Sequence, residues 1–313
     1  MNGNESKNSP EKHEGQSHAH DVSGSSGAKM FWVSILNAAI TAVEIIGGIL
    51  SGSLALISDS IHNLGDTVSI ILSYAAIRIS SKRKDIKKTY GYKRAQIIAA
   101  FINASALIVI SFFLVYEAIK RFGSPEKIDG TLMIAVAVIG LIANLLSVLI
   151  LEKDSRNSMN IKSTYLHLLG DTVSSFGVVL GGIAIKVWDI VWVDPLITLL
   201  VAAYVMYEAS KITMKSIDIL MQSSADMDYD EIQKDIESID EVKNIHHVHT
   251  WLADEKTIFF EAHVEVGENL KVCDTAAIYE KIERLLMEHY GISHVTIQIE
   301  GNSCSDKDLF QLK

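Results

Sequence analysis

The octapeptide HNLGDTVS at residues 62–69 returns as HLLGDTVS at residues 167–174, and only its second residue differs. Both copies lie within long apolar segments that are typical of membrane-spanning helices. In each copy a His and an Asp are spaced i, i+4, so they share one helix face, one turn apart. Two such faces turned toward each other would present two imidazoles and two carboxylates, a tetrahedral donor set that favours Zn²⁺. The four candidate ligands are His62, Asp66, His167 and Asp171.

Other polar residues in the apolar segments have competing interpretations. A single His-x-x-x-Asp pair could simply pair with neighbours inside a helix bundle, but repetition of the whole octapeptide favours a metal site. Glu44 and Asp59 could line a cation path, because a buried carboxylate needs a partner or a proton. Asn144 is expected to form a hydrogen bond between helices. Asp194, which precedes a proline, is interpreted as a device that starts its own helix.

The composition indicates a membrane protein with an attached polar domain. Of the 313 residues, 49% are hydrophobic, yet 21% are charged, more than a protein wholly within a membrane would carry. The net charge of −10 argues against nucleic acid as a partner. The two cysteines, Cys273 and Cys304, provide no disulfide framework and suit a reducing, cytosolic location for the C-terminal part.

Residues 1–28 are rich in Ser, Gly, Asn, Glu, Lys and His, which predicts a disordered cytosolic tail. The start of the chain has no apolar core, so it is not expected to be a secretory signal peptide. A few of its residues could bind metal loosely or be incidental: His13, His18, His20 and Asp21.

Six apolar segments, each near the length needed to cross a bilayer, predict a membrane all-α bundle of six transmembrane helices over residues 29–212. They lie at about 30–50, 58–80, 95–121, 130–151, 161–186 and 190–210. Lys and Arg concentrate after the second, fourth and sixth segments, although the loop after the third is basic as well. Because basic loops stay on the cytosolic side, this balance places both termini in the cytosol.

After a linker at 213–224, the pattern becomes that of a small folded domain at 225–302, followed by a C-terminal tail at 303–313. Apolar residues recur at helical spacing in 226–239 and 271–290, whereas 242–252, 257–266 and 294–300 alternate as strands do. The order αββαβ predicts a cytosolic α+β ferredoxin-like domain. So short a domain buries a limited core, which favours pairing with a second copy.

The predicted strands of this domain carry a second group of metal-ligand residues. Alternation along the first strand places His247 and His249 on one face and His246 on the other. The histidines could therefore form two sites, form one site shared between copies, or be half-exposed strand residues. The group comprises His246, His247, His249, His263, Gln298 and Glu300.

Together these features resemble the cation diffusion facilitators, in particular their bacterial cobalt-zinc-cadmium branch, which is related to vertebrate zinc transporters. The resemblance covers about residues 28–302 and also rests on TYGYKR at 89–94, HHVHTW at 246–251 and HVTIQ at 294–298. It implies six helices, a homodimer, a cytosolic metallochaperone-like domain, and exchange of Zn²⁺ for H⁺ by alternating access across the plasma or inner membrane.

The resemblance also implies roles for particular residues. The quartet of the two octapeptides would be the transport site, and a His in the second segment goes in the family with a preference for zinc over cadmium or manganese. His246, His263 and Glu300 are candidate ligands of a cytosolic regulatory site. Zn²⁺ would then be the transported substrate and a regulatory ligand, no cofactor would be needed, and the protein would not be an enzyme.

The chain departs from some relatives in three places, one of which is the loop between the fourth and fifth segments, which lacks the long histidine run of many eukaryotic members. The loop between the second and third segments has no histidine, so no metal site is expected there. Gln298 and Glu300 stand where some relatives carry His and Asp, which departs from the binuclear cluster of those proteins.

Three other functions compete with zinc export. A membrane metalloenzyme would use the same quartet to activate water, but it needs an open coordination position and a separate base. A zinc receptor that signals without transport would be expected to carry an additional effector domain. A transporter of a different ion remains open, because Co²⁺, Fe²⁺, Mn²⁺ and Cd²⁺ also suit these ligands.

Overall fold

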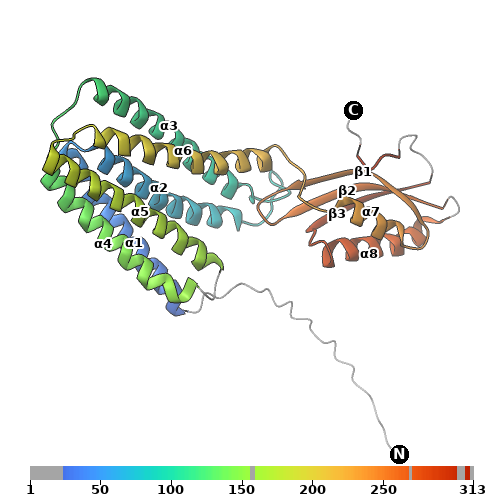
Figure 1. Ribbon diagram of the computed structural model, residues 1–313. Helices are drawn as coiled ribbons and strands as arrows, with labels where there is room; N and C mark the ends of the chain where they lie inside the picture. Colours follow the sequence, from blue (N-terminus) through green and yellow to red (C-terminus); the bar gives the residue numbers. More distant parts are fainter. Residues whose placement is uncertain (1–23, 156–158, 268–269, 302–306, 311–313) are drawn as a thin grey trace, which may run out of the picture.

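The computed structural model describes residues 24–155, 159–267, 270–301 and 307–310. Six long helices form an elongated bundle, and the C-terminal domain lies beyond one end of it (Figure 1). This arrangement confirms the expected all-α membrane bundle. The helices are α1 (Gly24–Ser51), α2 (Leu54–Ser80), α3 (Ala95–Gly123), α4 (Gly130–Ser155), α5 (Met159–Trp188) and α6 (Val193–Leu220). Thus α1 begins inside the stretch expected to be a tail, and α6 ends inside the stretch expected to be a linker.

Five of these helices are long and apolar enough to cross a membrane, and α2 is not among them. With 27 residues α2 is long enough, but it carries Asp59, His62, Asp66 and Arg78, which lower its mean hydropathy. It packs against α1, α3 and α6, and both Asp59 and His62 are buried. Asp59 and His62, two of the polar residues that weaken the apolar pattern of α2, therefore face other helices, as expected of a functional membrane segment.

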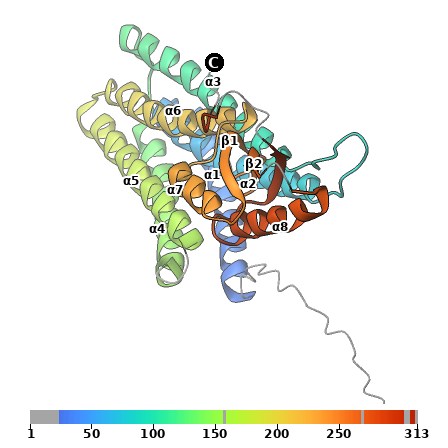
Figure 2. The same cartoon turned by 90° about the vertical axis from the view of Figure 1, so that its right-hand side faces the viewer.

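The bundle is packed differently at its two ends. Both views show α4 alongside α5 and α3 alongside α6 (Figures 1 and 2). Far from the C-terminal domain, a buried cluster draws on α2, α4 and α5, with α6 packed against it: Leu56, Met133, Val178, Ile185 and Ile197. Toward the C-terminal domain, the buried cluster among the described side chains draws only on α1, α4 and α5: Val33, Val148, Leu151 and Leu168.

Asp194 joins three helices at the far end of the bundle. It lies in the first turn of α6 and is fully buried. Its carboxylate accepts hydrogen bonds from Ser53 Oγ at 2.5 Å and from the backbone N–H groups of Leu54 and Ala55 at 2.9 Å and 3.1 Å. Arg121 of α3 lies 3.7 Å from the same carboxylate. Asp194 thus lies in the first turn of α6, as expected, and its carboxylate in addition caps the start of α2, which was not predicted.

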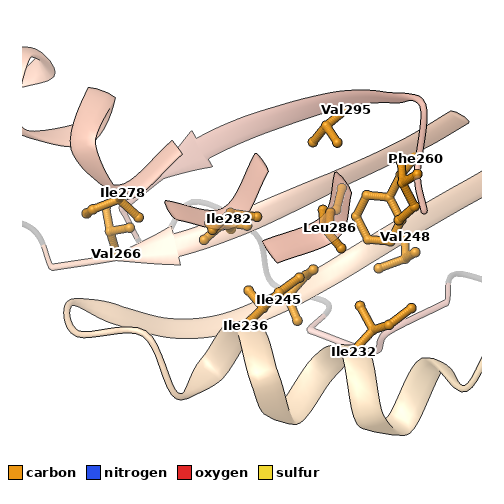
Figure 3. Close-up of a cluster of buried hydrophobic side chains, with 13 residues drawn as sticks. Ile232, Ile236, Ile245, Val248, Phe260, Val266, Ile278, Ile282, Leu286 and Val295 are labelled. Atoms are coloured by element: carbon orange, nitrogen blue, oxygen red, sulfur yellow. The ribbon is translucent and has the colours of Figure 1, made fainter. Parts of the chain in front are cut away.

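The C-terminal domain is a three-stranded sheet with two helices on one face (Figure 1). Its elements are α7 (Tyr229–Glu237), β1 (Val242–Leu252), β2 (Ile258–Val266), α8 (Val272–Glu288) and β3 (His294–Glu300), which confirms the predicted order αββαβ. The central strand β2 is antiparallel to β1 and parallel to β3. Figure 3 shows the core, where Ile236 of α7 and Ile282 and Leu286 of α8 pack against strand residues such as Phe260.

After β3 the chain returns to the sheet. The backbone N–H of Val248 donates a hydrogen bond to the carbonyl oxygen of Leu309 at 2.8 Å, and Leu309 and Phe310 pack against the core. Part of the expected C-terminal tail thus contacts β1. Cys304 and the candidate residues of the N-terminal tail lie outside the described residues.

Candidate metal centres

The first centre lies where α2 and α5 face each other. One ligand atom from each of His62, Asp66, His167 and Asp171 lies within 4.8 Å of the others. Each imidazole is closest to the carboxylate of the opposite helix: 2.9 Å separate His167 Nε2 from Asp66 Oδ2, and 3.3 Å separate His62 Nε2 from Asp171 Oδ1. The i, i+4 distances within the helices are 4.0 Å and 3.7 Å. The structure therefore brings all four predicted residues together.

Burial divides this quartet into a buried and an accessible half. The side chains of His62 and Asp171 are 9% and 3% exposed, whereas those of Asp66 and His167 are 27% and 40% exposed. Both ring nitrogens of His62 and Oδ2 of Asp171 are buried without a hydrogen-bond partner. Because buried polar atoms rarely lack a partner, these atoms point to a ligand, and imidazole with carboxylate is a donor set that suits Zn²⁺.

Helices α3 and α6 flank this centre. Gly65 allows α3 to approach, since a Cβ at this position would come within 2.6 Å of Leu107 Cδ2. A Cβ at Gly170, in the second octapeptide, would only touch the hydroxyl of Tyr204 on α6, at 3.7 Å. The ring of Tyr204 lies edge-on to that of His62, with 6.1 Å between the centroids. Tyr204 could not be predicted from the sequence, because a lone Tyr in an apolar segment has no informative spacing.

The second centre lies on the sheet of the C-terminal domain. One ligand atom from each of His246 on β1, His263 on β2 and Glu300 on β3 lies within 4.8 Å of the others. His246 Nε2 lies 3.0 Å from Glu300 Oε1, and His263 Nδ1 lies 3.7 Å from Glu300 Oε2. His246 Nε2 and Glu300 Oε1 are both buried, and neither makes a hydrogen bond. Two such atoms facing each other are expected where both point at a common ligand.

A β-bulge in β1 produces this convergence. His246 and His249 of β1 are paired with His263 and Glu261 of β2, so β1 carries one extra residue, and His247 has a φ of +54°. The prediction that His246 and His247 lie on opposite faces was wrong, because both rings approach His263, with centroids 5.6 Å and 4.6 Å away. His249 contacts the His247 ring but is itself exposed and lies outside the three-residue cluster.

The surroundings of His263 favour its neutral form. Partial burial, together with the nearby His247, lowers the pKa of His263. A metal binds the neutral imidazole, so this shift favours ligation near neutral pH. Gln298, which was among the candidate residues, donates a hydrogen bond to Glu300 Oε2 at 3.5 Å and so helps to hold the carboxylate.

Comparison with known proteins gives the family. Residues 30–221 match the cation efflux transmembrane domain, and residues 225–302 match the cytoplasmic domain of cation efflux proteins. The chain is 40% identical over 261 residues to a cadmium, cobalt and zinc/H(+)-K(+) antiporter of Bacillus subtilis, a match that covers 82% of this chain and 84% of the relative. It is 35% identical over 301 residues to the zinc transporter ZitB of Escherichia coli, covering 93% of this chain and 94% of the relative.

A third relative is the metal cation efflux system protein CzcD of Cupriavidus metallidurans, which is 34% identical over 303 residues, 95% of this chain and 94% of the relative. One family model matches the bundle and the other matches the C-terminal domain, and each of the three relatives matches more than four fifths of the chain. The chain is therefore an integral membrane protein that belongs to the cation diffusion facilitator family, in its bacterial branch of zinc, cadmium and cobalt efflux proteins.

Proposed function

We propose that this protein is a secondary active transporter that exports Zn²⁺ from the cytosol in exchange for H⁺, with Cd²⁺ and Co²⁺ as further substrates. The observation that carries the proposal is the quartet of His62, Asp66, His167 and Asp171, with its ligand atoms within 4.8 Å of one another inside a membrane bundle. The names of two relatives, a zinc transporter and a zinc/H(+)-K(+) antiporter, support the substrate and the counter-ion.

The quartet couples metal to protons through its own atoms. Zn²⁺ requires neutral imidazoles and ionised carboxylates, so metal and protons compete for the same nitrogen and oxygen atoms. Zn²⁺ binds the deprotonated quartet on the cytosolic side, and protons displace it on the opposite side. The same four residues then return in the protonated form, and no further groups are needed for a minimal exchange cycle.

The uneven packing of the bundle supports alternating access. At the far end, Asp194 connects α6 with the start of α2. Toward the C-terminal domain, the buried cluster leaves out α2, α3 and α6 as far as side chains are described, and the side chain of His167 is 40% exposed. These features support a state in which the quartet opens on the side of the C-terminal domain. The distribution of basic loops supports placing that side, with both termini, in the cytosol.

The C-terminal domain would act as a zinc sensor within a homodimer. Zn²⁺ bound to His246, His263 and Glu300 would favour one arrangement of the paired domains and thereby bias the membrane helices, which requires different zinc affinities in the two states. The convergence of these three side chains supports the sensor. The name of the matched cytoplasmic-domain family, ZT_dimer, supports the pairing of two copies.

Metal flux into proteoliposomes under an imposed pH gradient tests the transport proposal, with Zn²⁺, Cd²⁺, Co²⁺ and Mn²⁺ compared in parallel. We expect gradient-driven Zn²⁺ movement that Asp171→Ala abolishes, because this variant removes a buried ligand. Asp129→Ala, at an exposed position before α4, serves as the control and should transport normally.

Three outcomes would contradict parts of this proposal. Normal transport by Asp171→Ala would refute the site assignment. Zn²⁺ binding without flux in the wild-type protein would favour a receptor. Preferential movement of Mn²⁺ would refute zinc as the main substrate.

A further inference from the structure

Two buried carboxyl groups lie beside the quartet but outside it. Glu44 of α1 and Asp59 of α2 are each 1% exposed. Asp59 lies one turn before His62 on α2, so it is displaced from the quartet toward the far end of the bundle. In the described part of the chain, no Lys or Arg contacts either group, and the ligand set of the quartet includes neither. The mechanism proposed above leaves both of them unused.

The two groups differ in their hydrogen bonds. Asp59 accepts two, from Ser174 Oγ at 2.6 Å and from Ser175 Oγ at 3.0 Å, and Ser175 in turn accepts one from Asn144 at 3.2 Å. This last bond confirms Asn144 as a partner between helices. Two hydroxyl donors on a carboxylate stabilise its ionised form, because they donate to the negative oxygens.

Glu44 has poorer support for a charge. Its Oε2 accepts one hydrogen bond, from Asn63 Nδ2 at 3.1 Å, while its Oε1 is buried without any partner. Oε1 points at Gly140 of α4, where the absence of a side chain makes room for it. A buried carboxylate oxygen without a hydrogen-bond partner strongly disfavours the charged form, and a proton removes most of that penalty. Glu44 is therefore the group of the pair that holds a proton.

Charges on neighbouring helices connect this proton to the metal. Asp59 of α2 and Asp171 of α5 both act electrostatically on Glu44. His62 and Asp171, two ligands of the quartet, act in the same way on Asp59. The hydrogen-bond donor to Glu44, Asn63, directly follows the ligand His62 in the sequence. A divalent cation at the quartet adds positive charge close to both carboxyl groups, which makes ionisation of Glu44 easier.

We propose that Glu44, with Asp59 beside it, is a proton-binding site separate from the metal quartet. The O–H bond of Glu44 breaks when Zn²⁺ occupies the quartet, and its proton passes to solvent. When Zn²⁺ leaves, Glu44 takes up a proton again, while Asp59 keeps the hydrogen bonds from its two serines. This inference deepens the proposed zinc/proton exchange, on which its role in transport rests, and it adds one proton to those carried by the metal ligands.

Calorimetric titration of the detergent-solubilised full chain with Zn²⁺ tests the inference without requiring transport. Repeating the titration in buffers of different ionisation enthalpy counts the protons released per bound Zn²⁺. Glu44→Gln keeps the shape of the side chain but cannot lose the proton, so we expect it to release about one proton fewer than wild type. Thr41→Val on the same helix, which is buried and donates a hydrogen bond to the Asn37 carbonyl, should match wild type.

Each outcome of the titration either supports or overturns the assignment of Glu44 as a proton-binding site. An unchanged proton count in Glu44→Gln would overturn the proposal, and so would loss of Zn²⁺ binding, which would make Glu44 part of the metal site. If Glu44→Gln fails to fold, infrared spectra of the wild-type protein replace it: Zn²⁺ should remove a carboxylic-acid C=O band in addition to any from Asp66 and Asp171, and the absence of this additional loss would refute the site. A wild-type protein that releases this proton but moves no zinc in proteoliposomes would refute the transport function alone.

Discussion

Neighbouring histidines of β1 have different surroundings, and single substitutions can separate their roles. His246 is fully buried, 3.0 Å from Glu300, whereas His249 is exposed beyond the bulge. We expect His246→Ala to raise the zinc concentration for half-maximal transport about tenfold, because it removes a ligand of the proposed sensor, and to leave transport at high zinc intact. Initial Zn²⁺ flux into proteoliposomes, measured against zinc concentration, gives this value.

His249→Ala is the matched control, since it removes the same side chain from the same strand outside the cluster. It should keep the wild-type zinc dependence. A His246→Ala variant with wild-type zinc dependence would show that the cluster has no sensing role, whatever else it binds.

At this scale the two centres differ in how far the sequence could predict them. The convergence of His62 with Asp66, and of His167 with Asp171, follows from the 3.6-residue period of a helix, which is a local property. The convergence of His246 with His263 depends on the bulge, which arises from the pairing of β1 with β2. Strand alternation applied to β1 alone therefore gave the wrong faces for His246 and His247.

Among the helices, the start of α2 depends on a side chain from α6. Asp194→Ala would leave the buried Ser53 hydroxyl and two backbone N–H groups without their acceptor. We expect it to lower the free energy of unfolding by about 2–4 kcal/mol, because buried unsatisfied donors are costly. Thermal unfolding of the detergent-solubilised protein measures the difference as a lower Tm.

Asp129→Ala is the control for the destabilisation caused by Asp194→Ala. The Asp129 carboxylate accepts hydrogen bonds from the backbone N–H groups of Thr131 and Leu132 at the exposed start of α4. Loss of such an exposed cap should cost about 1 kcal/mol. Equal destabilisation by the two variants would mean that Asp194 contributes no more than an ordinary helix cap.

The elements themselves were largely predictable, because apolar length and periodicity decide them. All six long helices of the bundle and the order αββαβ were predicted from these patterns. The role of Asp194 did not, since the sequence places it before a proline at the start of α6, where an acidic residue usually serves its own helix. Its partner, the start of α2, lies far away in the sequence and is adjacent only in the folded bundle.

In the whole molecule, the loop between α2 and α3 touches the C-terminal domain. The ring of Tyr90 lies edge-on to Phe259 of β2, with 5.2 Å between centroids, and Lys93 Nζ donates a hydrogen bond to Thr257 Oγ1 at 2.7 Å. Lys215 of α6 and Glu255 form a further ion pair at 2.9 Å. The sequence could not predict these contacts, because relative domain placement leaves no periodic signal in either partner.

This contact offers a route from the proposed sensor to the transport helices, and a double-mutant cycle tests it. Phe259 lies on the strand that carries His263, and Tyr90 lies in the loop that joins the helix of His62 to α3. If the signal passes through Tyr90, then His246→Ala should shift the zinc dependence of transport in the wild-type background but not in Tyr90→Ala. Such non-additivity is expected of residues that act through one physical connection.

Ile86→Ala provides the matched background, because Ile86 lies in the same loop and is 98% exposed. In that background His246→Ala should cause its full shift. A shift of equal size in the Tyr90→Ala and Ile86→Ala backgrounds would show that the sensor acts through another route, for example the direct chain connection after α6. A shift lost in both would indicate that any change in the loop disrupts regulation, so the Tyr90–Phe259 contact would have no specific part in it.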